Sequence, residues 1–222
     1  MFKKSKLIIV IFLVLNMGAE DSLQISTTEL KMQDSKKTLY YATGNSSKFK
    51  TSASFIPQNA QIELKQFACN LFEEQTEDQV EIAVSKAKQA WELLQKPLLV
   101  DEVGVYFHKY NNFPGAFTKF VYKGLGFDGV YKLMNDGDEL SILLIIVYIY
   151  GPDQYKIFTI RKTGFFKKSD REYDKNAPFD LVFVPQGLDK TYIELEEFPE
   201  IYNKVYYRAV GMREVLEFIS LE

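Results

Sequence analysis

The fold is decided by the stretch Tyr40-Tyr41-Ala42-Thr43-Gly44-Asn45-Ser46-Ser47-Lys48-Phe49-Lys50. It predicts a short strand, a tight turn at Gly44 and a helix, because the small polar residues 45–47 are all favoured at helix N-caps. The N–H groups at a helix start carry partial positive charge, so an anion can bind there, and Lys48 would add a full charge. The stretch is a candidate phosphate-binding site. It lacks the P-loop pattern, however, and a plain turn before a helix is the alternative.

Beyond this stretch, strand-like and helix-like segments alternate along the chain. Apolar residues recur at helical intervals in 78–94, whereas 141–150 is β-prone and turns at Gly151-Pro152-Asp153 into a hairpin. Predicted strands cover 38–42, 61–67, 97–100, 141–150, 155–161 and 181–184, and predicted helices cover 46–56, 78–94, 117–123, 127–134 and 208–219. This order predicts one mixed α/β domain over residues 38–222, with a central sheet flanked by helices.

Composition narrows the chemistry. The chain has 222 residues, of which 46% are hydrophobic, so a large packed core is expected. Its net charge of −3 gives no overall basic field of the kind that nucleic-acid-binding proteins carry. Cys69 and His108 are the only residues of their types, which excludes an intrachain disulfide framework and disfavours metal sites or triads built on His. Carboxylates and lysines are left to carry any reaction.

The N-terminal segment has the features of a secretory leader. Lys3, Lys4 and Lys6 precede the apolar run 7–15, and small residues follow before an acidic pair. The run is too short for a standard membrane span, so no stable span is expected. The cleavage site is imperfect, because Met17 stands two residues before Ala19. We expect a leader over 1–22 and a polar linker over 23–37; a buried strand is the alternative for the apolar run.

Acidic residues form a second candidate site. Asp101 and Glu102 follow a predicted strand directly, and Glu74 follows another by a short loop. Ligands of open α/β sheets bind beyond the carboxyl ends of strands, and carboxylates beside a phosphate site could hold Mg²⁺. The alternative is that the acids are solvated loop residues. That reading is preferred for Glu73, Glu77 and Asp78.

These features combine into ordered motifs. They are Thr43-Gly44-Asn45-x-x-Lys48, Glu81-Ile82-x-x-x-Lys86-Ala87, Pro97-Leu98-Leu99-Val100-Asp101-Glu102-x-Gly104, Phe113-Pro114-Gly115-x-Phe117-x-Lys119 and Phe183-x-Pro185-x-Gly187-x-x-Lys190-Thr191-Tyr192-x-Glu194. Through them the chain, from about residue 38 to 219, resembles the inosine triphosphate pyrophosphatase family, the Ham1-like pyrophosphatases. The resemblance implies two lobes with a nucleotide cleft between them, a homodimer, and Mg²⁺, with Mn²⁺ as the alternative ion. It also implies hydrolysis of unusual purine triphosphates, such as those of inosine and xanthosine, to monophosphate and pyrophosphate.

The resemblance also implies residue roles. Phosphates would be held by Thr43, Gly44, Asn45, Lys48, Lys86 and Lys119. The metal would be held by Glu74, Asp101 and Glu102, and Glu102 would also activate the attacking water. Phe179 would stack on the purine, and its edge would be read by Asp180, Tyr207 and Arg208.

Some positions depart from the family pattern. The usual acid–Asp–Thr/Ser reads Asp101-Glu102-Val103, and the longer side chain of Glu102 could shift its carboxylate by about 1 Å, enough to slow a reaction roughly 100-fold. The usual Ser-His-Arg reads Tyr206-Tyr207-Arg208, and Ala177-Pro178-Phe179-Asp180-Leu181 lacks a usual Gly and Pro. The phosphate-binding and metal-binding motifs are therefore closer to the family pattern than the motifs that contact the base.

Two functions stay open at this point. One is a Mg²⁺-dependent nucleoside triphosphate pyrophosphatase, and the other is a non-catalytic nucleotide-binding or interaction protein on the same fold. A secreted protein related to carbohydrate or lipid is a third and weaker reading, based only on the leader and the aromatic content. The resemblance implies the cytoplasm, whereas the leader implies the secretory route. No nucleic-acid partner is expected.

Overall fold

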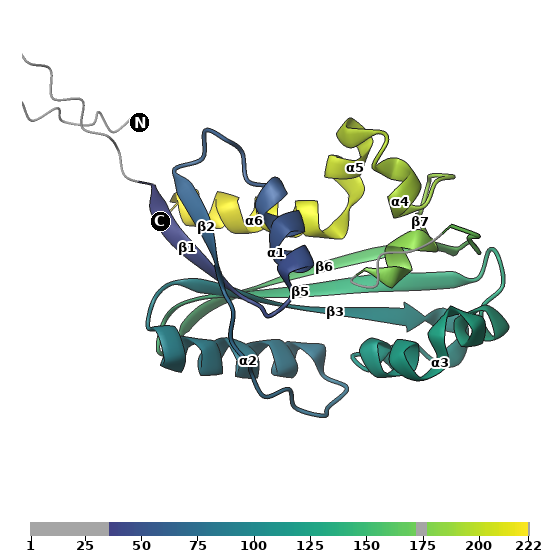
Figure 1. Cartoon of the computed structure of the whole chain (residues 1–222), viewed down its shortest axis with the longest axis horizontal. Helices are drawn as coiled ribbons and strands as arrows, with labels where there is room; N and C mark the ends of the chain where they lie inside the picture. Colours follow the sequence, from purple (N-terminus) through teal and green to yellow (C-terminus); the bar gives the residue numbers. More distant parts are fainter. Residues whose placement is uncertain (1–35, 172–176, 222) are drawn as a thin grey trace, which may run out of the picture. The chain divides into compact units, whose positions relative to one another are not determined.

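The computed structural model describes residues 36–171 and 177–221 (Figure 1). The predicted leader and nearly all of the predicted linker lie outside the described residues. Lys37, the last residue assigned to the linker, is instead the first residue of a strand. Within the described ranges, no helix is both long and apolar enough to cross a membrane.

A single mixed sheet forms the centre of the fold, as predicted. Its strands are β2 (Ile62–Phe67), β1 (Lys37–Ala42), β3 (Leu98–Phe107), β5 (Glu139–Gly151), β6 (Gln154–Phe166) and β7 (Phe183–Pro185) in spatial order, with β4 (Pro114–Gly115) paired to β3. β1 runs parallel to both of its neighbours, and the remaining pairs are antiparallel. The β5–β6 pair is the predicted hairpin. At the end away from the turn, its strands extend beyond the predicted bounds to Glu139 and Phe166.

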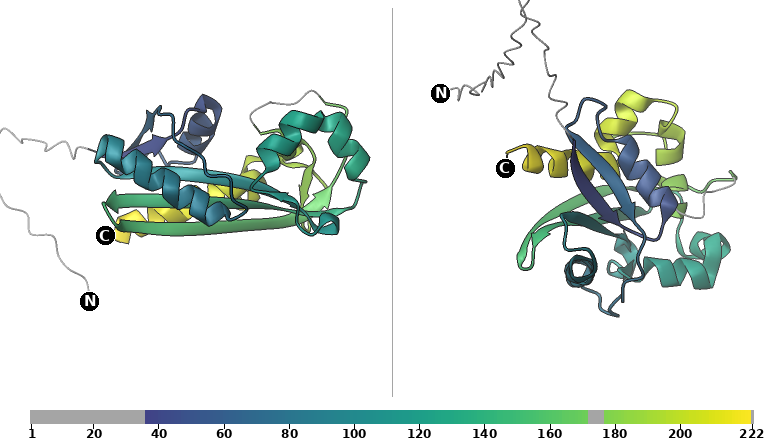
Figure 2. Two further views of the ribbon diagram at one scale, coloured as in Figure 1. Left: turned by 90° about the horizontal axis from the view of Figure 1, so that it is seen from below. Right: turned by 60° about the vertical axis from the view of Figure 1, so that its left-hand side comes forward.

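Helices cover both faces of this sheet. They are α1 (Ser46–Ser54), α2 (Gln79–Leu94), α3 (Thr118–Leu133), α4 (Tyr192–Leu195), α5 (Pro199–Val205) and α6 (Tyr207–Leu221), with 3₁₀ turns at His108–Tyr110 and Pro178–Leu181. α2 and α6 lie on opposite faces (Figures 1 and 2). Because β5 is covered on both sides, its sequence is a nearly continuous apolar run rather than an alternating one.

Each covering helix packs through residues suited to close contact. Three alanines of α2, Ala83, Ala87 and Ala90, are buried against the β5 face that carries Ile145 and Val147. On the other face, Met212, Val215 and Ile219 of α6 pack in the main core cluster. This core fixes the positions of the helix starts and strand ends that carry the candidate site.

β3 is longer than the sequence pattern indicated. It was predicted to end at Val100, with Asp101 and Glu102 just beyond its end, and this was wrong. β5 pairs with β3 along its full length, from Leu98 to Phe107, so the two acids lie inside a strand. The pairing of β1 with β3, however, stops at Leu99. Both acids therefore lie past the carboxyl end of β1, and this places them near the residues that follow β1.

Other differences are local. α3 is divided at Gly126, whose φ of 60° and ψ of −173° are not helical, and this agrees with the prediction of two short helices. The predicted strand at 181–184 was partly wrong, because residue 181 closes a 3₁₀ turn and β7 begins at Phe183. β7 lies very close to β6: a Cβ added to Gly164 would lie 2.1 Å from the carbonyl oxygen of Val184. Neither α4 nor α5 was predicted.

Candidate active site

The strand–turn–helix at residues 40–50 forms as its sequence predicted. Asn45 is the N-cap of α1, and its Oδ1 accepts hydrogen bonds from the backbone N–H groups of Ser47 and Lys48 at 3.0 and 3.1 Å. The backbone N–H of Asn45 donates to Thr43 Oγ1 at 3.1 Å, which fixes the turn before the helix. The first turn of α1 is therefore held in place, and Lys48 is the cation that it presents.

Lys48 is one member of a buried charged group. Its Nζ lies 3.3 Å from Oδ1 of Asp101, while Nη1 of Arg208 lies 2.7 Å from Oδ2 of the same carboxylate. Arg208 Nη1 also lies 3.3 Å from the hydroxyl of Tyr41. Burial acts to raise the pKa of Asp101, but Lys48 and Arg208 outweigh it and hold that pKa well below its usual value. Asp101 is thus a charged carboxylate balanced by two cations from α1 and α6.

A second group gathers around Lys86 of α2. Its ammonium donates to Oε1 of Glu102 in a short contact and lies 3.3 Å from Oε2 of Glu73. Lys119, at the start of α3, lies 3.8 Å from the same oxygen of Glu73. Burial raises the pKa of Glu102, although Lys48 and Lys86 oppose that rise. The two groups are joined through β3, because Asp101 and Glu102 are consecutive residues.

Glu73 belongs to this site although the sequence favoured a solvated loop residue there. It lies in the irregular segment between β2 and α2, where neither periodicity nor a strand end marks any position. Its neighbour Glu74, the acid expected to hold a metal, accepts a hydrogen bond from Ser85 Oγ at 2.8 Å. Asp78, also interpreted as solvated, is the N-cap of α2. Of the acids discussed in this paragraph, Glu73 alone joins Glu102 at the ammonium group of Lys86.

The donor set around Lys86 suits a hard divalent cation. Glu73 and Glu102 both direct an oxygen at one ammonium group, so a small cation and phosphate oxygens could be accommodated there with water. Among the residues that the structure describes, no group of three or more His, Cys, Asp or Glu side chains forms a ready-made metal cluster. Any Mg²⁺ would therefore depend on substrate phosphates and water for the rest of its coordination.

The residues expected to contact a purine lie in the interior. Phe179 is 4% exposed, and its ring centroid lies about 6 Å from those of Phe107, Tyr122 and Phe127, at 6.0, 6.1 and 6.2 Å. Asp180 Oδ2 accepts a hydrogen bond from the hydroxyl of Tyr206 at 2.8 Å, and burial raises the pKa of Asp180 to about 7. Phe179 and Asp180 therefore both have other residues of the chain as their partners.

Tyr207 and Arg208 are also buried, at 3% and 5% exposure. The ring of Tyr207 packs at 4.6 Å from that of Tyr206, and Arg208 is engaged by Asp101. The structure thus brings Thr43, Asn45, Lys48, Asp101 and Arg208 together, and separately Lys86, Lys119 and Glu102. It keeps Phe179, Asp180 and Tyr207 inside the core.

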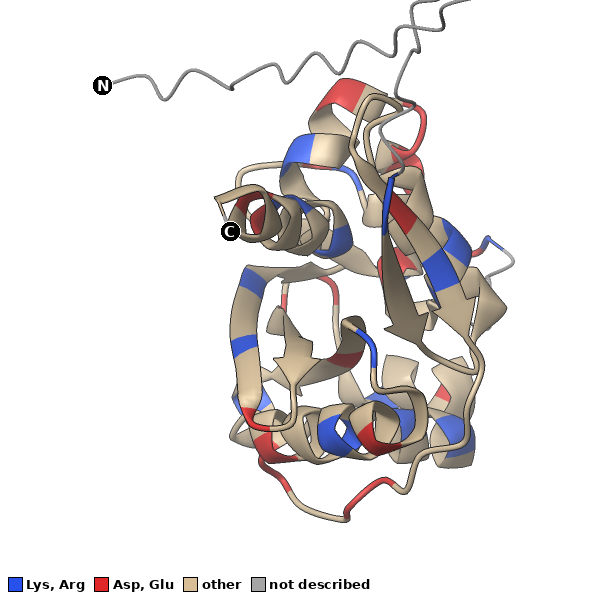
Figure 3. Cartoon of the chain, turned by 90° about the vertical axis from the view of Figure 1, so that its left-hand side faces the viewer, with Lys and Arg blue, Asp and Glu red and all other residues tan. Residues whose placement is uncertain are grey.

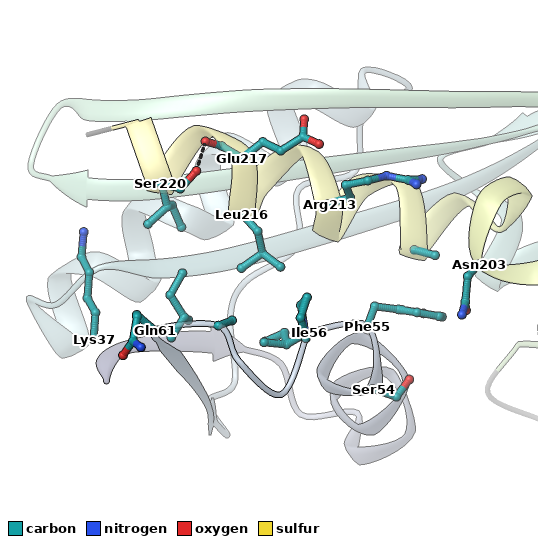
Figure 4. A pocket seen from close by; sticks show the side chains of 15 residues that line it. Lys37, Ser54, Phe55, Ile56, Gln61, Asn203, Arg213, Leu216, Glu217 and Ser220 are labelled. Carbon is teal, nitrogen blue, oxygen red and sulfur yellow. Dashed lines mark hydrogen bonds between the residues drawn. The ribbon is translucent and has the colours of Figure 1, made fainter. Parts of the chain in front are cut away.

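A prominent groove lies away from these residues. It is an open groove of about 730 Å³ between the end of α1, the start of β2 and α6, lined by residues such as Ile56, Leu216 and Arg213 (Figure 4). None of the predicted site residues lines it. Lys and Arg are interspersed with Asp and Glu over the ribbon (Figure 3).

Comparisons with known proteins converge on one family. A sequence model of the Ham1 family matches residues 39–218. The chain is 30% identical over 160 residues to a dITP/XTP pyrophosphatase of Korarchaeum cryptofilum, covering 71% of this chain and 84% of that protein. It is 30% identical over 142 residues to an inosine triphosphate pyrophosphatase of Scheffersomyces stipitis, covering 63% and 71%. The fold is similar to that of a HAM1 protein from Coxiella burnetii, with a TM-score of 0.66 at 19% identity, over 83% of this chain and 99% of that one.

Proposed function

The chain belongs to the Ham1 family, and from this we propose that it hydrolyses nucleoside triphosphates, those of inosine and xanthosine among them, to monophosphate and pyrophosphate. The observation that carries the proposal is the pairing of Lys48 and Lys86 with Asp101 and Glu102, consecutive acids of β3. Lys119 joins the same site through Glu73, which it shares with Lys86. Phosphoryl transfer depends mainly on positioning and on neutralising the charge of the phosphate oxygens. The site has the residue types for both tasks.

The lysines would bind and orient the triphosphate. Lys48, at the start of α1, and Lys86, on α2, approach β3 from different helices, and Lys119 adds a more exposed charge from α3. The remaining N–H groups at the start of α1 add partial positive charge. Together these groups favour a ligand with several negative charges over one with a single charge.

Glu102 would orient and deprotonate the attacking water. Burial raises its pKa, and a base with a raised pKa takes a proton more readily at neutral pH. The water oxygen then bonds to phosphorus, its proton passes to Glu102, the bond between the α- and β-phosphates breaks, and pyrophosphate leaves. Mg²⁺, held by Glu102 and either Glu73 or Glu74, would neutralise charge on the phosphate oxygens; Mn²⁺ is the alternative ion.

Pyrophosphate release from a triphosphate panel tests the proposal. We expect Glu102→Gln to lower kcat by about 10²–10⁴-fold, because it removes the base. Lys48→Ala should raise KM, and chelation of divalent ions should stop turnover. Glu63→Gln and Lys65→Ala are matched controls, since these residues form an exposed ion pair on β2. Turnover that neither site variant changes would contradict the mechanism.

A non-catalytic nucleotide-binding protein is the second candidate. Two features of Glu102, the proposed water-activating residue, favour it. Glu102 already contacts Lys86, and it stands where the family usually has the shorter Asp. Nucleotide-induced thermal stabilisation without any product would support this candidate. The homodimer implied by the family is likewise a proposal, which sedimentation of the full chain tests. Fractionation of cells carrying a C-terminally tagged chain separates the cytoplasm from the secretory route.

A further inference from the structure

We propose that Gln79 is a positioning residue, which fixes the backbone of β3 at Glu102 and thereby the place of the Glu102 carboxylate. The inference rests on the proposed function, in which Glu102 activates the attacking water. It extends that function to a buried amide side chain outside the ordered motifs of the sequence. Gln79 is the first residue of α2 and is 4% exposed.

The amide group of Gln79 makes three hydrogen bonds that reach two strands. Its Nε2 donates to the carbonyl oxygen of Glu102 at 2.9 Å and to that of Leu143, on β5, at 3.0 Å. Its Oε1 accepts a hydrogen bond from the hydroxyl of Tyr106 at 2.8 Å. Because an amide oxygen can only accept and an amide nitrogen can only donate, these partners fix a single orientation of the group. The side chain therefore joins the start of α2 to β3 and β5 beside Glu102.

A glycine of β3 leaves the space that this amide occupies. A Cβ added to Gly104 would lie 2.6 Å from Oε1 of Gln79 and 2.8 Å from the carbonyl oxygen of Gly115. Both distances are far shorter than the separation at which carbon atoms pack favourably. Any larger residue at position 104 would therefore displace the amide, the backbone at Gly115, or both. The strand itself thus provides the room for Gln79.

α2 holds Glu102 at two points. Lys86 lies seven residues beyond Gln79, which is about two helical turns, so both side chains project from the same face of α2. Gln79 binds the backbone oxygen of Glu102, whereas Lys86 binds its carboxylate. A side chain that is held at both its backbone and its tip has few conformations left to it. The place of the carboxylate is therefore set by the fit of α2 against β3.

The chemical nature of Gln79 points to positioning rather than to packing alone. Ile82 and Ala83, on the next turn of α2, are also buried and are apolar. A buried amide must be hydrogen-bonded to offset its loss of water, and the net gain in stability is small. What the amide adds over an apolar side chain is a fixed direction and distance between two elements. A misplacement of about 1 Å can slow a reaction roughly 100-fold, so loss of this amide should appear in the rate.

Gln79→Met tests the inference, because methionine is similar in length and in helix propensity but makes none of the three hydrogen bonds. Pyrophosphate release is measured on the full chain with Mg²⁺ and inosine triphosphate. We expect kcat to fall by about 10–100-fold. KM should change by less than about threefold, because the lysines proposed to bind phosphate are still present. An unchanged kcat, or a loss confined to KM, would overturn the inference.

Ile219→Ala controls for lost stability. Ile219 is buried in the core near the end of α6 opposite to Arg208, and it takes no part in the candidate site. The substitution should lower Tm, because it leaves a cavity, and should leave kcat unchanged at a temperature at which the protein is folded. A fall in kcat equal to that of Gln79→Met would attribute the loss to reduced stability and would overturn the inference.

A double-mutant cycle separates positioning from a general structural role. In the Glu102→Gln background, Gln79→Met should change kcat by less than about twofold, because the carboxylate that it positions is already absent. An equal fall in both backgrounds would overturn the inference. Tyr106→Phe is a milder variant for use if Gln79→Met fails to fold, since it removes only the hydroxyl that orients the amide. We expect a smaller fall in kcat that is again absent in the Glu102→Gln background, and a fall that persists there would overturn the inference.

A measurement that needs no turnover distinguishes this inference from the proposed function. If the wild type releases pyrophosphate from no triphosphate, the proposed function fails. NMR of the chain labelled with ¹³C at the glutamate carboxyl carbons then decides whether Gln79 positions Glu102, whose signal is identified by its loss in Glu102→Gln. We expect Gln79→Met to shift this signal and Ile219→Ala to leave it in place. A signal that Gln79→Met does not move would overturn the inference.

Discussion

Asp101→Asn should destabilise the fold strongly, because it removes the charge that balances two cations. The side chain of Asp101 is 2% exposed and that of Arg208 is 6% exposed, so their contact is shielded from water. After the substitution, Arg208 would lose its carboxylate partner, and its hydrogen bond to the hydroxyl of Tyr41 would remain. Breaking a buried pair by removing one partner costs about 3–5 kcal/mol, and we expect a loss of unfolding free energy in this range. For a domain of this size the loss corresponds to a fall in Tm of about 10 °C.

Urea denaturation followed by the fluorescence of Trp91, the single tryptophan, measures this loss. Asp153→Asn is the matched control: that side chain is 90% exposed and lies 4.0 Å from Lys88 Nζ, so the control should lose less than about 1 kcal/mol. Adding Arg208→Met to Asp101→Asn should recover part of the stability, since it removes the unpaired charge. Equal stability of the two asparagine variants would refute the reasoning.

The same variant has a defined pH dependence. The folded pKa of Asp101 lies below its unfolded value of 3.8, so the folded state favours the charged form. The stabilisation is therefore complete above the unfolded pKa and is lost as the pH falls through the folded pKa. We expect the difference between wild type and Asp101→Asn to be constant from about pH 5 to 8 and to shrink below about pH 4.

Three further changes give separable results. Asn45→Ala should lower the unfolding free energy by about 1 kcal/mol, because it removes the cap of α1, and should raise KM for nucleotides; an unchanged urea midpoint would count against the cap. In the folded wild type the Asp180 carboxyl keeps a proton that it loses on unfolding, so the wild type loses stability as the pH rises from 4 to 7. Asp180→Asn should therefore gain stability relative to wild type over this range, by on the order of a few kcal/mol. If urea titrations gave the same difference at every pH, the raised pKa of this carboxyl would be contradicted. Gly164→Ala should cost about 1–3 kcal/mol, because its methyl group would collide with Val184; a Tm equal to that of wild type would show that β7 can move away.

Much of the architecture could be predicted from the sequence, because the signals were local. The N-cap at Asn45 and the alanine-lined helix α2 each follow from a pattern within one turn or one heptad. The hairpin β5–β6 follows from its turn residues and a long β-prone run. The family resemblance rested on the same kind of short, ordered motif, and the match to the Ham1 family confirmed it.

The candidate site was harder, because its contacts join distant segments. The role of Asp101 depends on Arg208, which is 107 residues away. Glu73 has no local signal, and its contacts with Lys86 and Lys119 arise only when the β2–α2 segment folds against two helices. The length of β3 was missed for a similar reason, since charged residues interrupt the apolar run while pairing with β5 continues.

The short strand β7 leaves much of its neighbour uncovered. It pairs with β6 at Gly164, Phe165 and Phe166, and no strand in the described part of the chain pairs with this side of β6 before Gly164. Lys156, Arg161 and Lys162 occur along this portion. Positive side chains on an open strand hinder the stacking of one molecule onto another through backbone hydrogen bonds. We expect a chain without these three charges to associate more readily through this strand edge.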